Sequence, residues 1–124
     1  MRLVEFHLEV EDIARSLDFY FRLFPEARQV GWDQRTSVAL VFPDGYAIGL
    51  WTVGKTGLHG SRAGKHVHYA LQVTLDELEI YRNRLVAMGV DVIEHAWDPV
   101  NKSIYFFDPD HHQGEFMTKD WSGW

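Results

Sequence analysis

The sequence predicts an α+β fold in which two tandem βαβββ modules form one domain, residues 1–124. Two observations predict it. A strand pattern of period two runs into a helix pattern of period 3.6 near the N-terminus, and the same succession returns after the middle. A Pro-Asp turn between two apolar strands also occurs in each half, as "ALVFPDGYAIGLWT" and "SIYFFDPDHHQGEFMT". Such self-similarity is typical of repeated structural units.

The first module is expected at about 1–53. Residues 3–10, "LVEFHLEV", alternate apolar and polar side chains and predict a strand with one covered face. A helix should follow, with Asp12 as its N-cap and Pro25 as its stop. Its apolar stripe is Ile13, Leu17, Tyr20 and Phe24. Three shorter strands are predicted around 27–33, 36–42 and 46–52, with Trp32–Arg35 and Pro43–Gly45 as the turns.

The second module is expected at about 66–118, after a Gly-rich connection at 54–65 and before a tail at 119–124. The segment "HVHYALQV" repeats the strand pattern, and "TLDELEIYRNRLVAMG" predicts a helix. Thr74 and Glu77 have the spacing of a capping box, and Gly89 suits the C-terminal end. The helix stripe is Leu78, Tyr81, Leu85 and Met88. The remaining strands are predicted near 90–97, 102–107 and 112–118.

Composition narrows the class of protein. A hydrophobic share of 46% indicates a globular chain, and no apolar run is long enough to span a bilayer. The chain has no cysteine, which excludes thiolate metal sites and a cysteine nucleophile. The net charge of −6, with scattered Lys and Arg, argues against nucleic-acid binding. We therefore expect a cytoplasmic protein whose partner is a small molecule.

Each helix should cover the apolar face of its own sheet, so the opposite faces are expected to enclose a cleft between two curved mixed sheets. Strand parity predicts which side chains point into that cleft. They are Glu5, His7, Gly49, Trp51, His66, His68, Gln113, Glu115 and Met117. The second Pro-Asp copy has a carboxylate, Glu115, at the position where the first copy has Gly49.

The stretch "DIARSLDFY" after the first strand and the stretch "FFDPDHHQGEF" near the end resemble the vicinal oxygen chelate superfamily. This superfamily includes glyoxalase I, fosfomycin-resistance enzymes, extradiol dioxygenases and bleomycin-resistance proteins. The resemblance covers the whole chain. It implies a divalent metal between the modules, held by side chains of the first and last strands.

The resemblance implies a ligand set of Glu5, His68 and Glu115, while Gly49 falls on a fourth ligand position that it cannot fill. Glu5 stands where the family usually has histidine, and His7, two residues on, is the other candidate for that ligand. Two carboxylates and an imidazole suit Ni, Zn, Mn or Fe(II). Three protein ligands with open positions are typical of a catalytic site, where the ion acts as a Lewis acid.

Two functions of different classes follow from this resemblance. The first is a metal-dependent lyase or isomerase of the glyoxalase type, with Glu115 and His7 as catalytic residues. Ring-cleaving dioxygenase chemistry prefers two histidines and is less favoured. The second is a metal-free protein, like the bleomycin-resistance members, that sequesters a cationic compound in an aromatic-lined cleft.

The resemblance also implies a homodimer. The substrate cleft is predicted from Trp51, His66, Gln113 and Met117. His111 and His112 are assigned no role beyond their turn.

Overall fold

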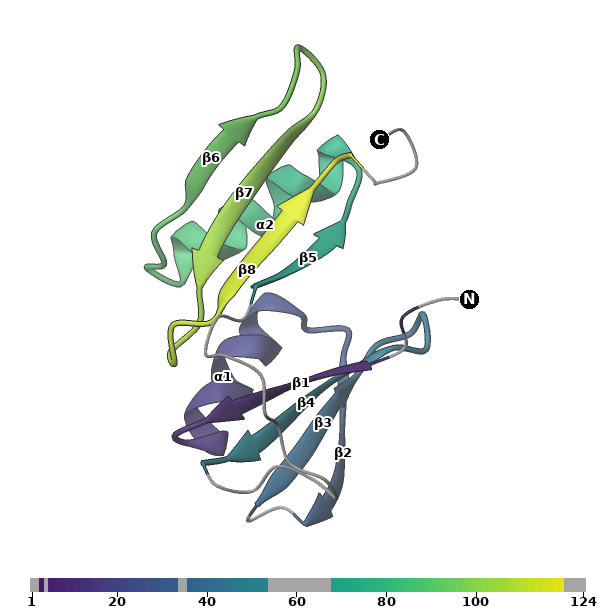
Figure 1. Cartoon of the computed structure of the whole chain (residues 1–124), viewed down its shortest axis with the longest axis vertical. Coiled ribbons are helices and arrows are strands. Elements are labelled where there is room, and N and C mark those ends of the chain that lie inside the picture. The colour runs from purple at the N-terminus through teal and green to yellow at the C-terminus, as the bar shows by residue number, and fades with distance from the viewer. Residues whose placement is uncertain (1–2, 4, 34–35, 54–67, 120–124) are drawn as a thin grey trace. The chain divides into compact units, whose positions relative to one another are not determined.

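The computed structural model describes residues 3, 5–33, 36–53 and 68–119. The chain divides into two compact units, Met1–Lys65 and His66–Trp124, and each is described by itself. In both units a strand and a helix are followed by three strands (Figure 1). This order confirms the predicted tandem βαβββ architecture.

The first unit contains a four-stranded mixed sheet and one helix. Its elements are β1 (Glu5–Val10), α1 (Ile13–Leu23), β2 (Arg28–Asp33), β3 (Ser37–Val41) and β4 (Ala47–Thr52). The strand order is β1-β4-β3-β2, with β1 parallel to β4 and the other neighbours antiparallel. The first and last strands of the unit are therefore side by side, and their side chains share the same two faces.

The second unit repeats this topology. Its elements are β5 (His68–Gln72), α2 (Leu75–Ala87), β6 (Ile93–Ala96), β7 (Lys102–Phe107) and β8 (Gln113–Met117). The strand order is β5-β8-β7-β6, and again only the first and last strands are parallel. The two sheets thus present equivalent strand pairs, β1 with β4 and β5 with β8.

Both helices begin where the capping residues predict. The Asp12 side chain accepts a hydrogen bond of 3.0 Å from the backbone N–H of Arg15. At α2 the Thr74 hydroxyl accepts from the Glu77 N–H at 3.2 Å, and the Glu77 carboxylate accepts from the Thr74 N–H at 2.8 Å. These bonds satisfy N–H groups that have no partner inside a helix, so they fix where each helix starts.

Strand β6 begins three residues later than predicted, and the end of α2 explains why. Gly89 adopts a positive φ of 73°, which stops the helix in the left-handed conformation. The backbone N–H of Val90 then donates to the carbonyl of Leu85 at 3.0 Å. The residues directly after the helix are used to satisfy its last carbonyls, so they are not available for sheet pairing.

Each helix covers one face of its own sheet, and that layer is the core of the unit. In the first unit the fully buried side chains include Leu8, Tyr20, Leu23, Leu40, Ile48 and Leu50. In the second they include Leu78, Leu85, Ile104, Phe106 and Phe116, with Tyr81 stacked on Phe116 at 4.2 Å between ring centroids. The polar side chains of the first strands therefore lie on the opposite faces. Among the described residues, no helix has the length and apolar character needed to cross a membrane.

Candidate functional site

The second unit brings two of the predicted ligands together. His68 is the first residue of β5, and Glu115 lies in the middle of the neighbouring parallel strand β8. The Nε2 atom of His68 is 2.9 Å from Oε2 of Glu115. Only 5% of the Glu115 side chain is exposed, against 34% of His68. The residue directly beside Glu115 on β5 is Ala70, whose small side chain leaves room for the carboxylate.

The second oxygen of this carboxylate is buried and unsatisfied. Among the described residues, Oε1 of Glu115 has no hydrogen-bond partner. A buried carboxylate oxygen without a partner is costly, and in folded proteins it commonly indicates an ion or a water molecule. An imidazole nitrogen and a carboxylate are both donors that divalent metals bind, so the chemistry of the pair fits such an ion.

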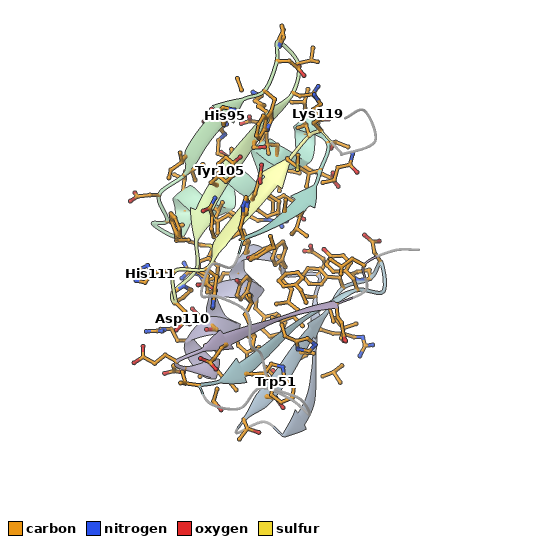
Figure 2. All side chains as sticks on the ribbon, viewed as in Figure 1. Trp51, His95, Tyr105, Asp110, His111 and Lys119 are labelled. Carbon is orange, nitrogen blue, oxygen red and sulfur yellow. The ribbon has the colours of Figure 1, made fainter. Side chains whose placement is uncertain are left out.

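Tyr105 extends this cluster. Tyr105, which Figure 2 labels, is a residue of β7. It pairs with Glu115 across β7 and β8, and its ring centroid is 5.9 Å from that of His68. Burial raises the pKa of the Tyr105 phenol above its ordinary value of 10.0, and its hydrogen bond to Glu115 and the charge of that carboxylate raise this pKa further. The hydroxyl therefore keeps its proton at neutral pH and can act as a hydrogen-bond donor. Tyr105 was not among the predicted site residues, although the pairing of the predicted strands 102–107 and 112–118 sets it opposite Glu115.

In the first unit the position equivalent to Glu115 is taken by Gly49, and the structure explains this loss. His7 pairs with Gly49 across β1 and β4. A Cβ atom at Gly49 would collide with the imidazole ring of His7. The strand pair in each unit therefore combines one large and one small residue. The large one is His7 on the first strand of one unit, and Glu115 on the last strand of the other.

His7 is held by hydrogen bonding on the same face of this sheet. The indole Nε1–H of Trp51, labelled in Figure 2, donates to Nδ1 of His7 at 2.7 Å. The other ring nitrogen, Nε2, is 3.6 Å from Oε2 of Glu5. The side chains of His7 and Glu5 are 38% and 58% exposed. Glu5 and His7 thus alternate with the buried side chains of Leu8 and Val10, as the period-two pattern of the strand predicts.

The remaining predicted site residues are distributed as follows. Gln113 lies beside His68, and Met117, which is 6% exposed, lies beside Gln72 in the same strand pair. His66 lies outside the described residues. Within the described residues, no three His, Asp or Glu side chains are grouped closely enough to hold a metal ion. His68 and Glu115 belong to the second unit and Glu5 to the first.

The two histidines of the second Pro-Asp turn differ from each other. Nδ1 of His112 is 2.7 Å from Oδ2 of Asp108, whose carboxylate is fully buried. The other Asp108 oxygen accepts hydrogen bonds of 2.9 Å from the N–H groups of Asp110 and His112. His111 has a positive φ of 65° at the tip. His112 thus closes the turn that leads into β8, which is a structural role that the sequence analysis did not anticipate.

Comparison with known proteins gives a family and a fold. The family model described as Glyoxalase/Bleomycin resistance protein/Dioxygenase superfamily matches residues 2–116. No curated protein matches the chain significantly in sequence. A lactoylglutathione lyase from Agrobacterium tumefaciens superposes with a TM-score of 0.79 at 18% identity, covering 94% of this chain and 92% of the other.

Two further solved structures show how wide the reactions of this fold are. The fosfomycin resistance protein FosX from Listeria monocytogenes, solved with Mn(II) and a sulfate ion, superposes with a TM-score of 0.70 at 21% identity, covering 98% of this chain and 90% of that one. The oxidase ChaP-H2 gives a TM-score of 0.70 at 18% identity over 98% and 96% of the two chains. At such identities the similarity establishes the fold alone, and the reaction has to be argued from the site.

Proposed function

The chain belongs to the glyoxalase/bleomycin resistance protein/dioxygenase superfamily, and from this premise we propose that it is a metal-dependent enzyme of the glyoxalase type. Its reaction would be a lyase or isomerase reaction on a small molecule that presents neighbouring oxygen atoms to the ion. The observation that supports this best is the buried Oε1 atom of Glu115, which has no partner among the described residues. A cation would satisfy it.

The proposed ligands are Nε2 of His68 and the carboxylates of Glu115 and Glu5. This donor set of one imidazole and two carboxylates suits Ni, Zn, Mn or Fe(II). When bound, such an ion polarises the oxygen atoms of the substrate as a Lewis acid. His68 and Glu115 are residues of the second unit, and Glu5 is a residue of the first.

The chain's own residues supply the rest of the proposed chemistry. Tyr105 keeps its phenolic proton because of burial and the nearby Glu115 charge, so its hydroxyl can donate to a substrate oxygen. The near-complete burial of Glu115 lowers the local dielectric and strengthens each charge interaction made there. Trp51, Gln113, Met117 and His66 are proposed to contact the substrate.

Metal content tests this proposal. The untagged protein is loaded with Ni, Mn, Zn or Fe(II) and dialysed, and bound metal is measured by elemental mass spectrometry. We expect close to one ion per chain, which Glu115→Gln and His68→Gln both lose. Glu94→Gln and His95→Gln are the controls, because both residues lie on β6 of the same sheet and should retain the ion. No bound ion, or one unaffected by the first two substitutions, would overturn the proposal.

A second candidate function is metal-free binding of a cationic compound, the alternative that the resemblance to bleomycin-resistance proteins suggests. Two observations favour it. The His7 ring fills the position of a fourth carboxylate beside Gly49, and the Trp51 indole is partly exposed on the same face. The net charge of −6 would attract a cation. This function predicts that a cationic ligand changes tryptophan fluorescence in metal-free protein, and that Glu115→Gln leaves that response intact.

A further inference from the structure

Trp51, His7 and Glu5 form a short chain of polar contacts on the open face of the first sheet. In each contact the chemistry of the two groups determines which one donates the proton and which one accepts it. We propose that His7 is a positioning residue that orients the Glu5 carboxylate, and that Trp51 fixes the tautomer of His7 that makes this possible. His7 is then not the metal ligand of the first strand. The role of Glu5 toward the metal rests on the proposed function. The hydrogen bond between Trp51 and His7 does not depend on that function.

The first link determines the tautomer. An indole N–H can only donate a hydrogen bond, so the Nδ1 atom of His7 that receives it must present a lone pair. The distance of 2.7 Å is that of a well-formed bond. In a neutral imidazole with a lone pair on Nδ1, the proton is on Nε2. Trp51 therefore selects the Nε2–H form of His7.

The second link points this proton at Glu5. Nε2 of His7 is 3.6 Å from Oε2 of Glu5, and the exposed Glu5 side chain needs to move only slightly to accept a hydrogen bond. Carboxylates that bind metals are commonly held by such an outer hydrogen bond, which orients them. In the proposed arrangement Glu5 closes this distance, His7 holds one of its oxygens, and the other oxygen gains a defined direction in which to bind a cation.

The same bonding excludes His7 as a ligand. A histidine binds a metal through a nitrogen with a lone pair, and here the lone pair of Nδ1 is engaged by Trp51 while Nε2 is protonated. Ligation would require breaking the bond to Trp51 and moving the ring. The ring lies over Gly49, whose missing side chain gives it this place. Glu5 keeps its lone pairs and is the ligand that the arrangement favours.

The tautomer is measured without metal, so the result is independent of the proposed function. Long-range ¹H–¹⁵N correlation spectra of metal-free protein above the titration range of histidine report which ring nitrogen has the proton. We expect His7 as the pure Nε2–H form in the wild type and a mixture of both forms in Trp51→Phe. A His7 protonated on Nδ1, or a spectrum that Trp51→Phe does not change, would overturn the inference.

The role of His7 and Trp51 in metal binding is tested by measuring the affinity of the protein for Mn(II) or Ni(II) in competition with a chelator. We expect Glu5→Gln to lose the most, and His7→Ala and Trp51→Phe to lose about ten- to a hundredfold, the usual effect of removing an outer hydrogen bond. His7→Gln should retain most of the affinity, because its amide can still donate to Glu5. Glu9→Gln, the next carboxylate on this face of β1, is the control.

The metal affinities distinguish failure of the inference about His7 from failure of the proposed metal-dependent function. If His7 were the ligand, His7→Gln would lose as much as His7→Ala, and Glu5→Gln would behave like the control. If the wild type binds neither ion, the proposed function fails and the role of Glu5 fails with it. The spectra still decide the bond between Trp51 and His7 in that case.

Discussion

At the scale of single residues, the environment of Tyr105 connects the site to a measurable pH dependence. Its pKa is raised from 10.0, first by burial and then by Glu115, so the unfolded chain loses the phenolic proton at a lower pH than the folded chain. The neutral phenol therefore contributes stability that is complete below about pH 10 and decreases as the pH rises through the folded pKa.

This gives a prediction for alkaline unfolding. Between about pH 9 and about pH 11, the free energy of unfolding in urea should fall more steeply for the wild type than for Tyr105→Phe. Glu115→Gln should have an intermediate slope, because it removes the charge but leaves the burial. Tyr69→Phe serves as the control. Equal slopes for the wild type and Tyr105→Phe would show that Tyr105 titrates normally.

A second residue-scale prediction concerns Gly114, next to Glu115 on β8. A Cβ atom there would collide with the ring of Phe106, which is fully buried beneath the sheet. Because the ring has no room to retreat, Gly114→Ala should destabilise the protein by about 1–3 kcal/mol, the usual cost of overpacking. Urea unfolding measures this. Phe106→Leu combined with Gly114→Ala should recover only part of this stability, because the smaller side chain removes the overlap but also loses packing contacts. An unchanged urea midpoint for Gly114→Ala alone would contradict the close contact between residues 114 and 106.

Sequence reasoning reached some of these residues and not others for a physical reason. Alternation along β1, β5 and β8 assigns each side chain to a face, so the faces of Glu5, His68 and Glu115 could be predicted in advance. The bond from Trp51 to His7 depends on the rotamers of two side chains, which no periodicity encodes. Tyr105 was within reach, because strand pairing alone sets it opposite Glu115, but a phenol is not among the metal ligands that the pattern suggested.

At the scale of elements, the pairing of parallel strands explains the asymmetry between the two sheets. His7 beside Gly49 and Ala70 beside Glu115 are equivalent pairs with the large residue on opposite strands. A glutamate at position 49 is therefore incompatible with a histidine at position 7 but compatible with an alanine at position 7. A side chain at position 49 and the imidazole of His7 therefore compete for the same space.

This relation predicts a strongly non-additive double variant. Gly49→Glu alone should lose about 1–3 kcal/mol, because the new side chain overlaps the His7 ring. His7→Ala combined with Gly49→Glu should recover most of this loss, since it reproduces the Ala70 and Glu115 arrangement. A double-mutant cycle of urea unfolding, with His7→Ala as the other single variant, measures the coupling. Additive effects would contradict the packing relation.

Helix ends were the most predictable elements and strand starts the least. Asp12 and the pair Thr74 and Glu77 are local signals, because a cap is made by residues within three positions of one another. The start of β6 depends on how the end of α2 satisfies its carbonyls around Gly89, and the run of apolar residues after it contained no sign of this. The order of elements was nevertheless correct throughout.

At the scale of the whole molecule, the proposed metal binds the folded chain and not the unfolded one. Metal should therefore stabilise the chain against unfolding by about 2.7 kcal/mol at a free concentration a hundred times the dissociation constant. We also expect a homodimer in solution, which sedimentation equilibrium tests, with a monomer at all concentrations as the contradicting result.

In the proposed site one histidine, His68, binds a metal together with Glu115. Pulsed electron paramagnetic resonance of the protein loaded with Mn(II) measures this directly, because a bound imidazole nitrogen couples to the electron spin. We expect coupling to a single directly bound nitrogen, lost in His68→Gln and retained in His7→Gln. Coupling that survives His68→Gln, or that disappears in His7→Gln, would contradict it.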